Sequence, residues 1–220
     1  INVGGTRIAY VKSVPPSSQS KSRSSFREVW VTDVDGTNQR QFTSGPNNSW
    51  SPEWTPDGNL SFLSLRKEHN KFTQIYTIPT DGGEAVPLTS HSGSVSSYSW
   101  SPNGKWIAYI SKDKISIEEQ ERKTEGYDMI VMGKEQLYNR LWIFDLETKS
   151  HETIFRQDLN VSNFVWSPDS KFIIFQASEK VNIDQEYLES SIYLVKAPSG
   201  NPRKIIDTPG KLGSMSISPN

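Results

Sequence analysis

One pentapeptide recurs along the chain with small changes: Trp54-Thr55-Pro56-Asp57-Gly58, Trp100-Ser101-Pro102-Asn103-Gly104 and Trp166-Ser167-Pro168-Asp169-Ser170. A degenerate copy, Ile217-Ser218-Pro219-Asn220, stands at the end of the sequence, and residues 5–11 align with residues 104–110. Proline ends a strand because it has no N–H to donate, and Asp-Gly or Asn-Gly favours a tight turn. The motif therefore predicts a strand, a turn and a second strand, repeated along the chain.

The spacing of the copies indicates a repeat architecture. They start near residues 1, 54, 100, 166 and 217, so that 53, 46, 66 and 51 residues separate them. WD40 and kelch propeller blades repeat every ~40–50 residues. Each interval has the same predicted order of four strands, with a polar hairpin after the second strand. We predict an all-β fold, a β-propeller of four-stranded blades over residues 1–220, with about four blades present.

The predicted strands follow the same order in every blade. The first strands are 60–65, 106–111 and 172–177, and the second are 29–31, 75–78, 141–144 and 192–195. The third are short, around Phe42 and at 86–88, 154–155 and 205–206, and the fourth are 96–100, 161–166 and 213–217. The longest interval carries a charged insert, about residues 112–140. In this insert Glu118, Glu119 and Glu121 alternate with basic residues, which predicts a solvated helix or flap. Residues 15–25, rich in serine, predict a loop.

Composition excludes several classes of function. The 24 basic and 25 acidic residues nearly balance, which argues against a nucleic-acid or anionic-membrane partner. No apolar run approaches the roughly 20 residues that span a bilayer, so we expect a soluble chain. Because there is no cysteine, disulfides and thiolate chemistry are excluded. This composition favours a cytoplasmic location, with a periplasmic or secreted one left open.

The residues that could carry catalysis form no recognisable site. A serine-hydrolase nucleophile needs Gly-x-Ser-x-Gly between a strand and a helix. The nearest string, Gly93-Ser94-Val95-Ser96-Ser97, has its serines in the wrong register and no helix pattern after it. The three histidines, His69, His91 and His151, fall in or beside predicted turns of different blades. We interpret them as solvated turn residues and predict no catalytic residue in the chain.

Metal and cofactor patterns are equally weak. Asp33-x-Asp35-Gly36-x-Asn38 begins like a calcium loop, but Ser44 stands at position 12, where an EF-hand has a glutamate. We interpret this stretch as an Asp-Gly hairpin like those of the other blades. Nothing in the sequence directs Arg66, Arg140 or Arg203 toward a central channel. We predict no metal and no cofactor.

The repeated motif resembles the TolB-type, WD40-like propeller repeat, in which Trp-Ser-Pro-Asp-Gly-Lys precedes an Ile-Ala-Tyr strand. Residues 100–109 match almost throughout, whereas Ser170 replaces the glycine in the next copy. A narrower resemblance is to the N-terminal propeller of prolyl oligopeptidase-family serine peptidases, especially the acylaminoacyl-peptidase branch. It rests on the charged insert and on its exit, residues 138–148, which read Tyr-Asn-Arg-Leu-Trp-Ile-Phe-Asp-Leu-Glu-Thr.

The narrower resemblance implies a non-catalytic, substrate-gating domain in a ring of about six to eight blades. An α/β-hydrolase domain in the same polypeptide would hold the Ser-Asp-His triad and act on short peptides. The chain starts just after one motif position and stops at another, so we expect a piece of a longer array. The alternative is a TolB-like propeller that binds a protein or peptide without chemistry. A third hypothesis, a lyase with metal and histidines at the channel, is disfavoured by three scattered histidines. The sequence does not indicate the oligomeric state.

The tryptophan of the motif predicts a measurable packing energy. A buried Trp side chain removes roughly 150–250 Å² from water, and we expect Trp100 to pack between neighbouring blades. Trp100→Ala should therefore lower the free energy of unfolding by roughly 3–5 kcal/mol. Thermal melting of the two proteins measures the change, and an unchanged melting temperature would contradict a core role for Trp100.

Overall fold

A computed structural model describes residues 1–2, 4–16, 25–45, 47–66, 71–114, 137–182, 188–207, 210 and 212–218. Residue contacts divide the chain into two compact units, Ile1–Ile107 and Ala108–Asn220, and each is described by itself. The described part contains no helix that is long and apolar enough to cross a membrane. Most of the charged insert, including Glu118, Glu119 and Glu121, lies outside the described residues, as do residues 17–24 of the serine-rich loop.

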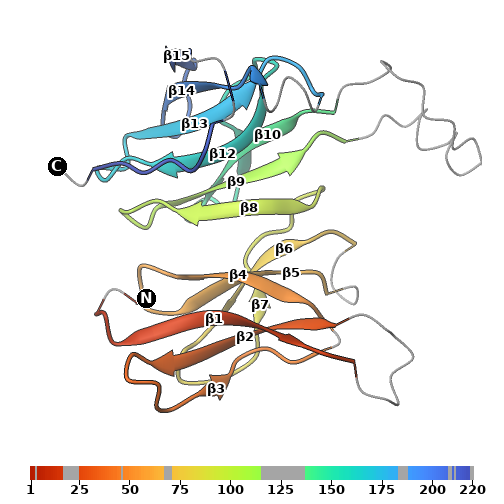
Figure 1. Ribbon diagram of the computed structural model, residues 1–220, viewed down its shortest axis with the longest axis vertical. Coiled ribbons are helices and arrows are strands. Elements are labelled where there is room, and N and C mark those ends of the chain that lie inside the picture. Colours follow the sequence, from red (N-terminus) through yellow and green to blue (C-terminus); the bar gives the residue numbers. More distant parts are fainter. Residues whose placement is uncertain are drawn as a thin grey trace, which may run out of the picture. The chain divides into compact units, whose positions relative to one another are not determined.

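The first unit contains one three-stranded and one four-stranded antiparallel sheet (Figure 1). The first has the order β1-β2-β3, with strands Arg7–Val14, Phe26–Asp33 and Arg40–Gln41. The second has the order β4-β5-β6-β7, with strands Ser49–Trp54, Leu60–Ser64, Gln74–Ile78 and Val86–Pro87. β8, Val95–Trp100, also lies in this unit. In both sheets, strands that follow one another in the sequence pair antiparallel, which is the topology of a propeller blade.

The second unit repeats the same topology. The third sheet has the order β11-β10-β9-β8, with β9 at Trp106–Lys112, β10 at Asn139–Asp145 and β11 at His151–Thr153. The division between the units falls inside β9. The fourth sheet has the order β12-β13-β14-β15, with strands Asn160–Trp166, Phe172–Ser178, Ser191–Lys196 and Arg203–Ile206. Four successive antiparallel sheets confirm the predicted all-β, blade-by-blade fold.

Two predicted strands differ from the structure. We predicted a short strand at residues 154–155, whereas the structure has β11 at His151–Thr153. Ile154 and Phe155 follow β11 and are buried: the Ile154 N–H donates to the Leu141 carbonyl of β10 at 3.1 Å, and the Phe155 ring stacks on Phe175 at 5.0 Å. No strand is assigned in residues 212–218, although the motif predicted one at 213–217.

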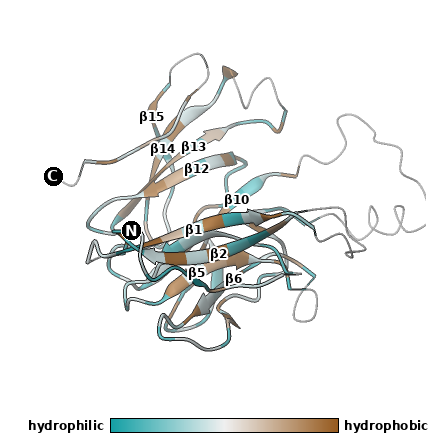
Figure 2. Ribbon diagram, turned by 60° about the horizontal axis from the view of Figure 1, so that its bottom comes forward, coloured by the Kyte–Doolittle hydropathy of each residue, from teal (hydrophilic) through white to brown (hydrophobic). Residues whose placement is uncertain are grey.

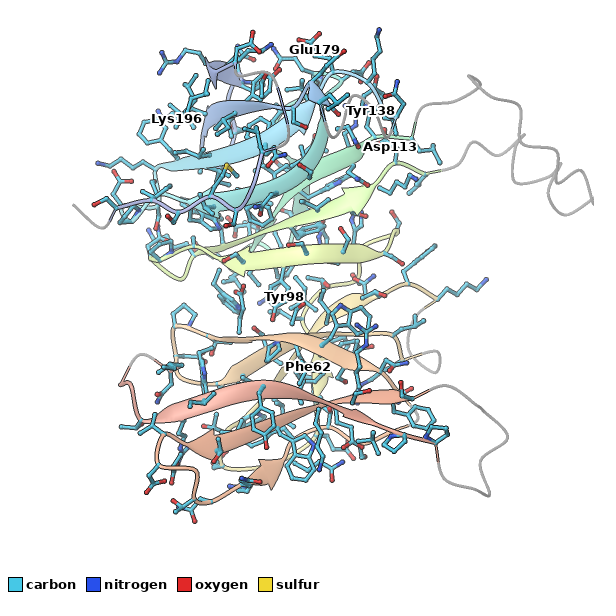
Figure 3. The ribbon with its side chains drawn as sticks, viewed as in Figure 1. Phe62, Tyr98, Asp113, Tyr138, Glu179 and Lys196 are labelled. Carbon is cyan, nitrogen blue, oxygen red and sulfur yellow. The ribbon has the colours of Figure 1, made fainter. Side chains whose placement is uncertain are left out.

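The core of the first unit lies between its two sheets. Val29 and Val31 of β2 pack with Leu60, Phe62 and Tyr76, and all five side chains are buried. Figure 3 shows Phe62 inside this unit, and its ring stacks on Tyr76 at 6.1 Å. Hydrophobic and hydrophilic segments succeed one another along β1 and β2 in Figure 2. The two sheets of this unit therefore bury the apolar residues of their pleated strands against each other.

The repeated pentapeptide forms the turn between β4 and β5, between β8 and β9, and between β12 and β13. In the third blade the Gly104 N–H donates to the Ser101 carbonyl at 2.9 Å, and the Ser101 hydroxyl donates to Asn103 Oδ1 at 2.8 Å. The residue at the glycine position has a positive φ in all four sheets: Gly5 66°, Gly58 85°, Gly104 70° and Ser170 60°. Only glycine adopts this region at little cost, so the motif is turn chemistry and not a ligand site.

Trp100 lies between neighbouring sheets, as predicted, but is only partly buried. Its Nε1 donates to the hydroxyl of Ser61 on β5 at 2.9 Å. The exposed part of the ring loses nothing on truncation, so the expected cost of Trp100→Ala moves to the lower end, about 3 kcal/mol.

Two glycines of the repeated turn form a matched pair for mutation. A Cβ added at Gly58 meets nothing within 4 Å, whereas one at Gly104 meets Pro56 Cβ and Cγ at 3.0 Å. Gly58→Ala should lower the free energy of unfolding by about 1–2 kcal/mol through backbone strain alone. Gly104→Ala should cost about 1–3 kcal/mol more, because Pro56 must also move. Urea unfolding of both variants measures the difference, and equal costs would show that the turns do not pack as described.

Candidate functional site

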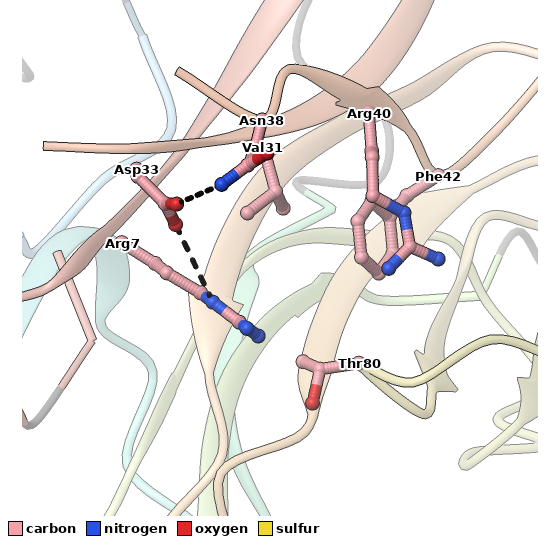
Figure 4. A pocket seen from close by; sticks show the side chains of 7 residues that line it. All are labelled: Arg7, Val31, Asp33, Asn38, Arg40, Phe42 and Thr80. Carbon is pink, nitrogen blue, oxygen red and sulfur yellow. Dashed lines mark hydrogen bonds and ion pairs between the residues drawn. The ribbon is translucent and has the colours of Figure 1, made fainter. Parts of the chain in front are cut away.

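A polar pocket of about 230 Å³ lies in the first unit, at the hairpin end of the first sheet (Figure 4). Sequence elements from two blades line it: the start of β1, the end of β2, the hairpin with β3, and the turn after β6. The lining residues are Arg7, Val31, Asp33, Asn38, Arg40, Phe42 and Thr80. Cationic, anionic, hydroxyl and aromatic side chains thus meet in one small concave space.

The β2–β3 hairpin fixes one wall of the pocket. Its turn uses Gly36 with φ 82° and Asn38 with φ 53°. Asp35 Oδ1 accepts from the backbone N–H and the hydroxyl of Thr37 at 2.9 and 2.7 Å, and these bonds hold the pKa of Asp35 below its ordinary value. Because the Asp35 carboxylate is used within the turn, the structure confirms the hairpin interpretation of the calcium-like stretch. The described residues contain no group of three or more histidine, aspartate or glutamate side chains arranged to hold a metal.

The charges in the pocket do not cancel. Asp33 accepts from Asn38 Nδ2 at 2.7 Å and lies 3.7 Å from Arg7 Nε. The Arg40 guanidinium lies over the Phe42 ring at 5.5 Å, and no carboxylate of the described residues is within ion-pair distance of it. Two arginines against one aspartate leave one excess positive charge in the pocket.

The repeated motif does not predict this pocket, but one residue in the sequence departs from the repeat there. Arg7 occupies the motif position that is filled by Leu60, Trp106 and Phe172 in the other blades. Across the sheet Arg7 faces Asp33, whereas Leu60 faces Ile78. A charged pair in the first sheet therefore replaces the apolar pair of the second, and Arg7 is the one charged residue among the four at this motif position, which is a departure that a comparison of the repeats could have found.

The arginines singled out in the sequence have other environments. Arg66 lies over the Phe62 and Tyr76 rings at 5.9 and 4.9 Å, and Arg203 is exposed on β15. Arg140 joins the base of the charged insert to a neighbouring connection: it binds Asp113 at 3.1 Å, the Gln157 carbonyl at 2.8 Å and Asp158 at 2.7 Å.

The two ends of the charged insert meet where β9 ends and β10 begins. The Asp113 N–H donates to the Tyr138 carbonyl at 2.8 Å, and Figure 3 shows both residues at that end of the sheet. The Arg140 guanidinium also lies 4.8 Å from the Tyr138 ring centroid. Arg140 therefore positions the base of the insert and has no described link to a reacting group.

The histidine interpretation was wrong for the two described histidines. His91 is 7% exposed, because the buried Gln74 side chain binds its backbone N–H and carbonyl at 2.8 and 2.9 Å. His151 begins β11 and is half-buried; its Nδ1 lies 2.9 Å from the Tyr109 hydroxyl, and burial lowers its pKa. His69 lies outside the described residues. The string Gly93–Ser97 runs into strand β8 and not into a helix, so it is no nucleophile elbow.

Glu53 is an unexpected acidic group at the junction of the second and third blades. Its Oε2 accepts from the Trp100 N–H at 3.3 Å, and burial raises its pKa to about 7 despite hydrogen bonds from Trp100 and Ser99. Tyr98 lies beside it, labelled in Figure 3, and bonds to Ser61 at 2.9 Å. The pKa of Tyr98 is raised by its own burial and by the nearby charge of Glu53.

The raised pKa of Glu53 predicts a pH dependence of stability. The folded state binds the proton more tightly than the unfolded state, whose pKa is near the ordinary value of 4.5. Stability contributed by this group is therefore present below pH 4.5 and is lost as the pH rises through about 7. The loss should be on the order of 3 kcal/mol, since the pKa rises from 4.5 to about 7 and one pKa unit corresponds to about 1.4 kcal/mol.

Replacing Glu53 isolates its share of that dependence. Glu53→Gln should be less sensitive than the parent between pH 5 and pH 8, and more stable than it at pH 8, by thermal melting at both values. The same drop in both proteins would show that Glu53 is not the group responsible.

No family model matches the chain. It is 28% identical over 189 residues to the uncharacterized peptidase YuxL of Bacillus subtilis, an alignment that covers 79% of this chain and 28% of that protein. Among solved structures, a putative TolB from Agrobacterium tumefaciens has a TM-score of 0.58 at 20% identity, covering 93% of this chain and 64% of that one. An acylaminoacyl peptidase of Pyrococcus horikoshii has a TM-score of 0.63 at 16% identity, covering 92% and 31%.

These comparisons extend the description of the fold. The chain spans less than a third of the length of YuxL and of the acylaminoacyl peptidase chain. Its structural neighbours include TolB propellers and the propeller domains of acylaminoacyl and related peptidases, as the resemblance of the motif implied, and also oligogalacturonate lyases, which at 14% and 19% identity share the fold alone. The four sheets are therefore blades of a TolB-type β-propeller, and the chain's relatives are peptidases.

Proposed function

We propose that this chain is the non-catalytic propeller domain of a prolyl oligopeptidase-family serine peptidase. In this proposal it gates the access of short peptides to an α/β-hydrolase domain in the same polypeptide. The observation that carries the proposal is the alignment of 79% of the chain with 28% of a peptidase, because it places the blades in one part of a longer relative. The blade structure supports it, since the repeated motif serves turns and core and leaves catalysis to another domain.

The physics of gating follows from the rigidity of blades. Each described sheet has a buried core and tight turns, so a ring of such blades excludes folded proteins and admits only narrow chains. The insert whose base Arg140 fixes, and the pocket at the end of the first sheet, supply the polar surfaces for contact with substrate or hydrolase domain. A near-neutral charge supports peptides and not nucleic acid as partners. A cytoplasmic location stays a prediction from the absence of cysteine.

The second candidate function is a TolB-like propeller that binds a protein or peptide without chemistry. It is favoured by the TM-score of 0.58 with a putative TolB, of which this chain covers 64%. A lyase that uses metal and histidines at the channel gains no support from the described histidines, because His91 and His151 lie in separate blades and bond to Gln74 and Tyr109.

The gene that contains these blades provides the test. We expect Gly-x-Ser-x-Gly, then Asp, then His, in the sequence that follows the propeller. The full-length protein should hydrolyse an N-acetyl-dipeptide nitroanilide and spare a folded protein such as ubiquitin, whereas the hydrolase domain without residues 1–220 should lose that discrimination. A gene that ends after further blades would contradict the peptidase proposal and favour the TolB-like one. Equal discrimination with and without the propeller would contradict gating.

A further inference from the structure

The pocket of Figure 4 presents guanidinium groups whose N–H donors have few partners among the described residues. The guanidinium of Arg40 is supported by the Phe42 ring at 5.5 Å but has no carboxylate of the described residues within ion-pair distance. Arg7 makes only a long contact with Asp33, at 3.7 Å, and its side chain is 47% exposed. Planar guanidinium groups match a carboxylate through two parallel N–H bonds. The cationic side of the pocket therefore fits a small anion.

The remaining lining residues restrict which anion fits. One net positive charge, with Asp33 in the same space, suits a monoanion and opposes a phosphate that carries about two charges. Val31 and Phe42 give the pocket an apolar wall beside the guanidinium groups. Asp33 accepts from Asn38 through Oδ2 and retains the capacity to accept an N–H from a ligand. Carboxylate, apolar side chain and N–H are the three groups that the last residue of a peptide presents together.

The size of the pocket agrees with that ligand. Pockets for drug-sized molecules hold ~300–1,000 Å³. The volume of about 230 Å³ is smaller and is comparable to one amino-acid residue. Because the pocket opens to solvent at the ends of β1 and β2, the rest of a bound peptide can extend away from it.

We propose that Arg7 and Arg40 bind the free α-carboxylate of a short peptide, with its last side chain on Phe42 and Val31 and its N–H toward Asp33. This site deepens the gating function proposed above and rests on it only for the claim that the peptides are substrates or products of the parent enzyme. Binding itself is a property of residues 7–80 and needs no hydrolase domain. A free amino acid carries the same carboxylate, so the experiment must distinguish these two sources.

Titration of the 220-residue chain by two-dimensional NMR tests the proposal. The probes are N-acetyl-Gly-Phe, its C-terminal amide, free phenylalanine and inorganic phosphate. We expect millimolar binding of N-acetyl-Gly-Phe, with shifts at Val31, Asp33 and Phe42, and at least about tenfold weaker binding of the amide, since a charge-assisted bidentate pair is lost. Binding of phosphate or free phenylalanine as tight as that of the peptide would overturn the assignment.

Arg40→Gln provides the residue-level test, with Arg203→Gln as the matched control on an exposed edge strand. Arg40→Gln should weaken the peptide about tenfold, Arg40→Lys should weaken it less because the charge remains, and Arg203→Gln should change nothing. All three arginine variants change exposed side chains, and the dispersion of their spectra reports whether they fold. Equal affinities for Arg40→Gln and Arg203→Gln would overturn the site. A gene without a serine triad would overturn the peptidase proposal while leaving this binding result in place.

Discussion

In the first unit each of the two sheets has an apolar face that the other sheet covers, and the rest of that unit follows from this constraint. In the first unit Val29 and Val31 of one sheet pack with Leu60, Phe62 and Tyr76 of the next. Apolar and polar side chains must therefore alternate along these strands, and the chain must turn tightly between β4 and β5. The positive φ at Gly58 and Gly104 supplies the turn, and the close approach of Pro56 to Gly104 joins successive turns. What remains free to vary is the polar surface at the strand ends.

The groups that we propose for binding and gating lie at those ends. The Arg7–Asp33 pair replaces the apolar Leu60–Ile78 pair of the neighbouring sheet and opens a charged pocket without disturbing the core. Arg140 similarly lies at the start of β10 and fixes the base of an insert. A propeller domain in a peptidase needs this arrangement, because a rigid frame can then carry substrate-facing groups that differ from blade to blade.

The sequence predicted the fold well where a residue's role is local. The turn motif located the strands next to it, which are β5, β8, β9, β12 and β13, because proline and glycine restrict or free their own backbone. The short outer strands were less predictable: His151–Thr153 was misplaced because Ile154 and Phe155 look like a strand but are buried by tertiary packing. The burial of His91 and the role of Glu53 were not predicted for the same reason. Their partners, the Gln74 side chain and the Trp100 N–H, come from distant positions in the sequence. The pocket was detectable only as a departure of Arg7 from the repeat.

The central claim is that these blades serve a catalytic serine located on another part of the polypeptide. Labelling the full-length protein with a fluorophosphonate, which reacts with activated serines of hydrolases, tests it most directly. After digestion and mass spectrometry, the account predicts a single labelled serine outside residues 1–220, and no labelling of the isolated 220-residue chain. A labelled serine within the blades, or a full-length protein with no reactive serine, would contradict it.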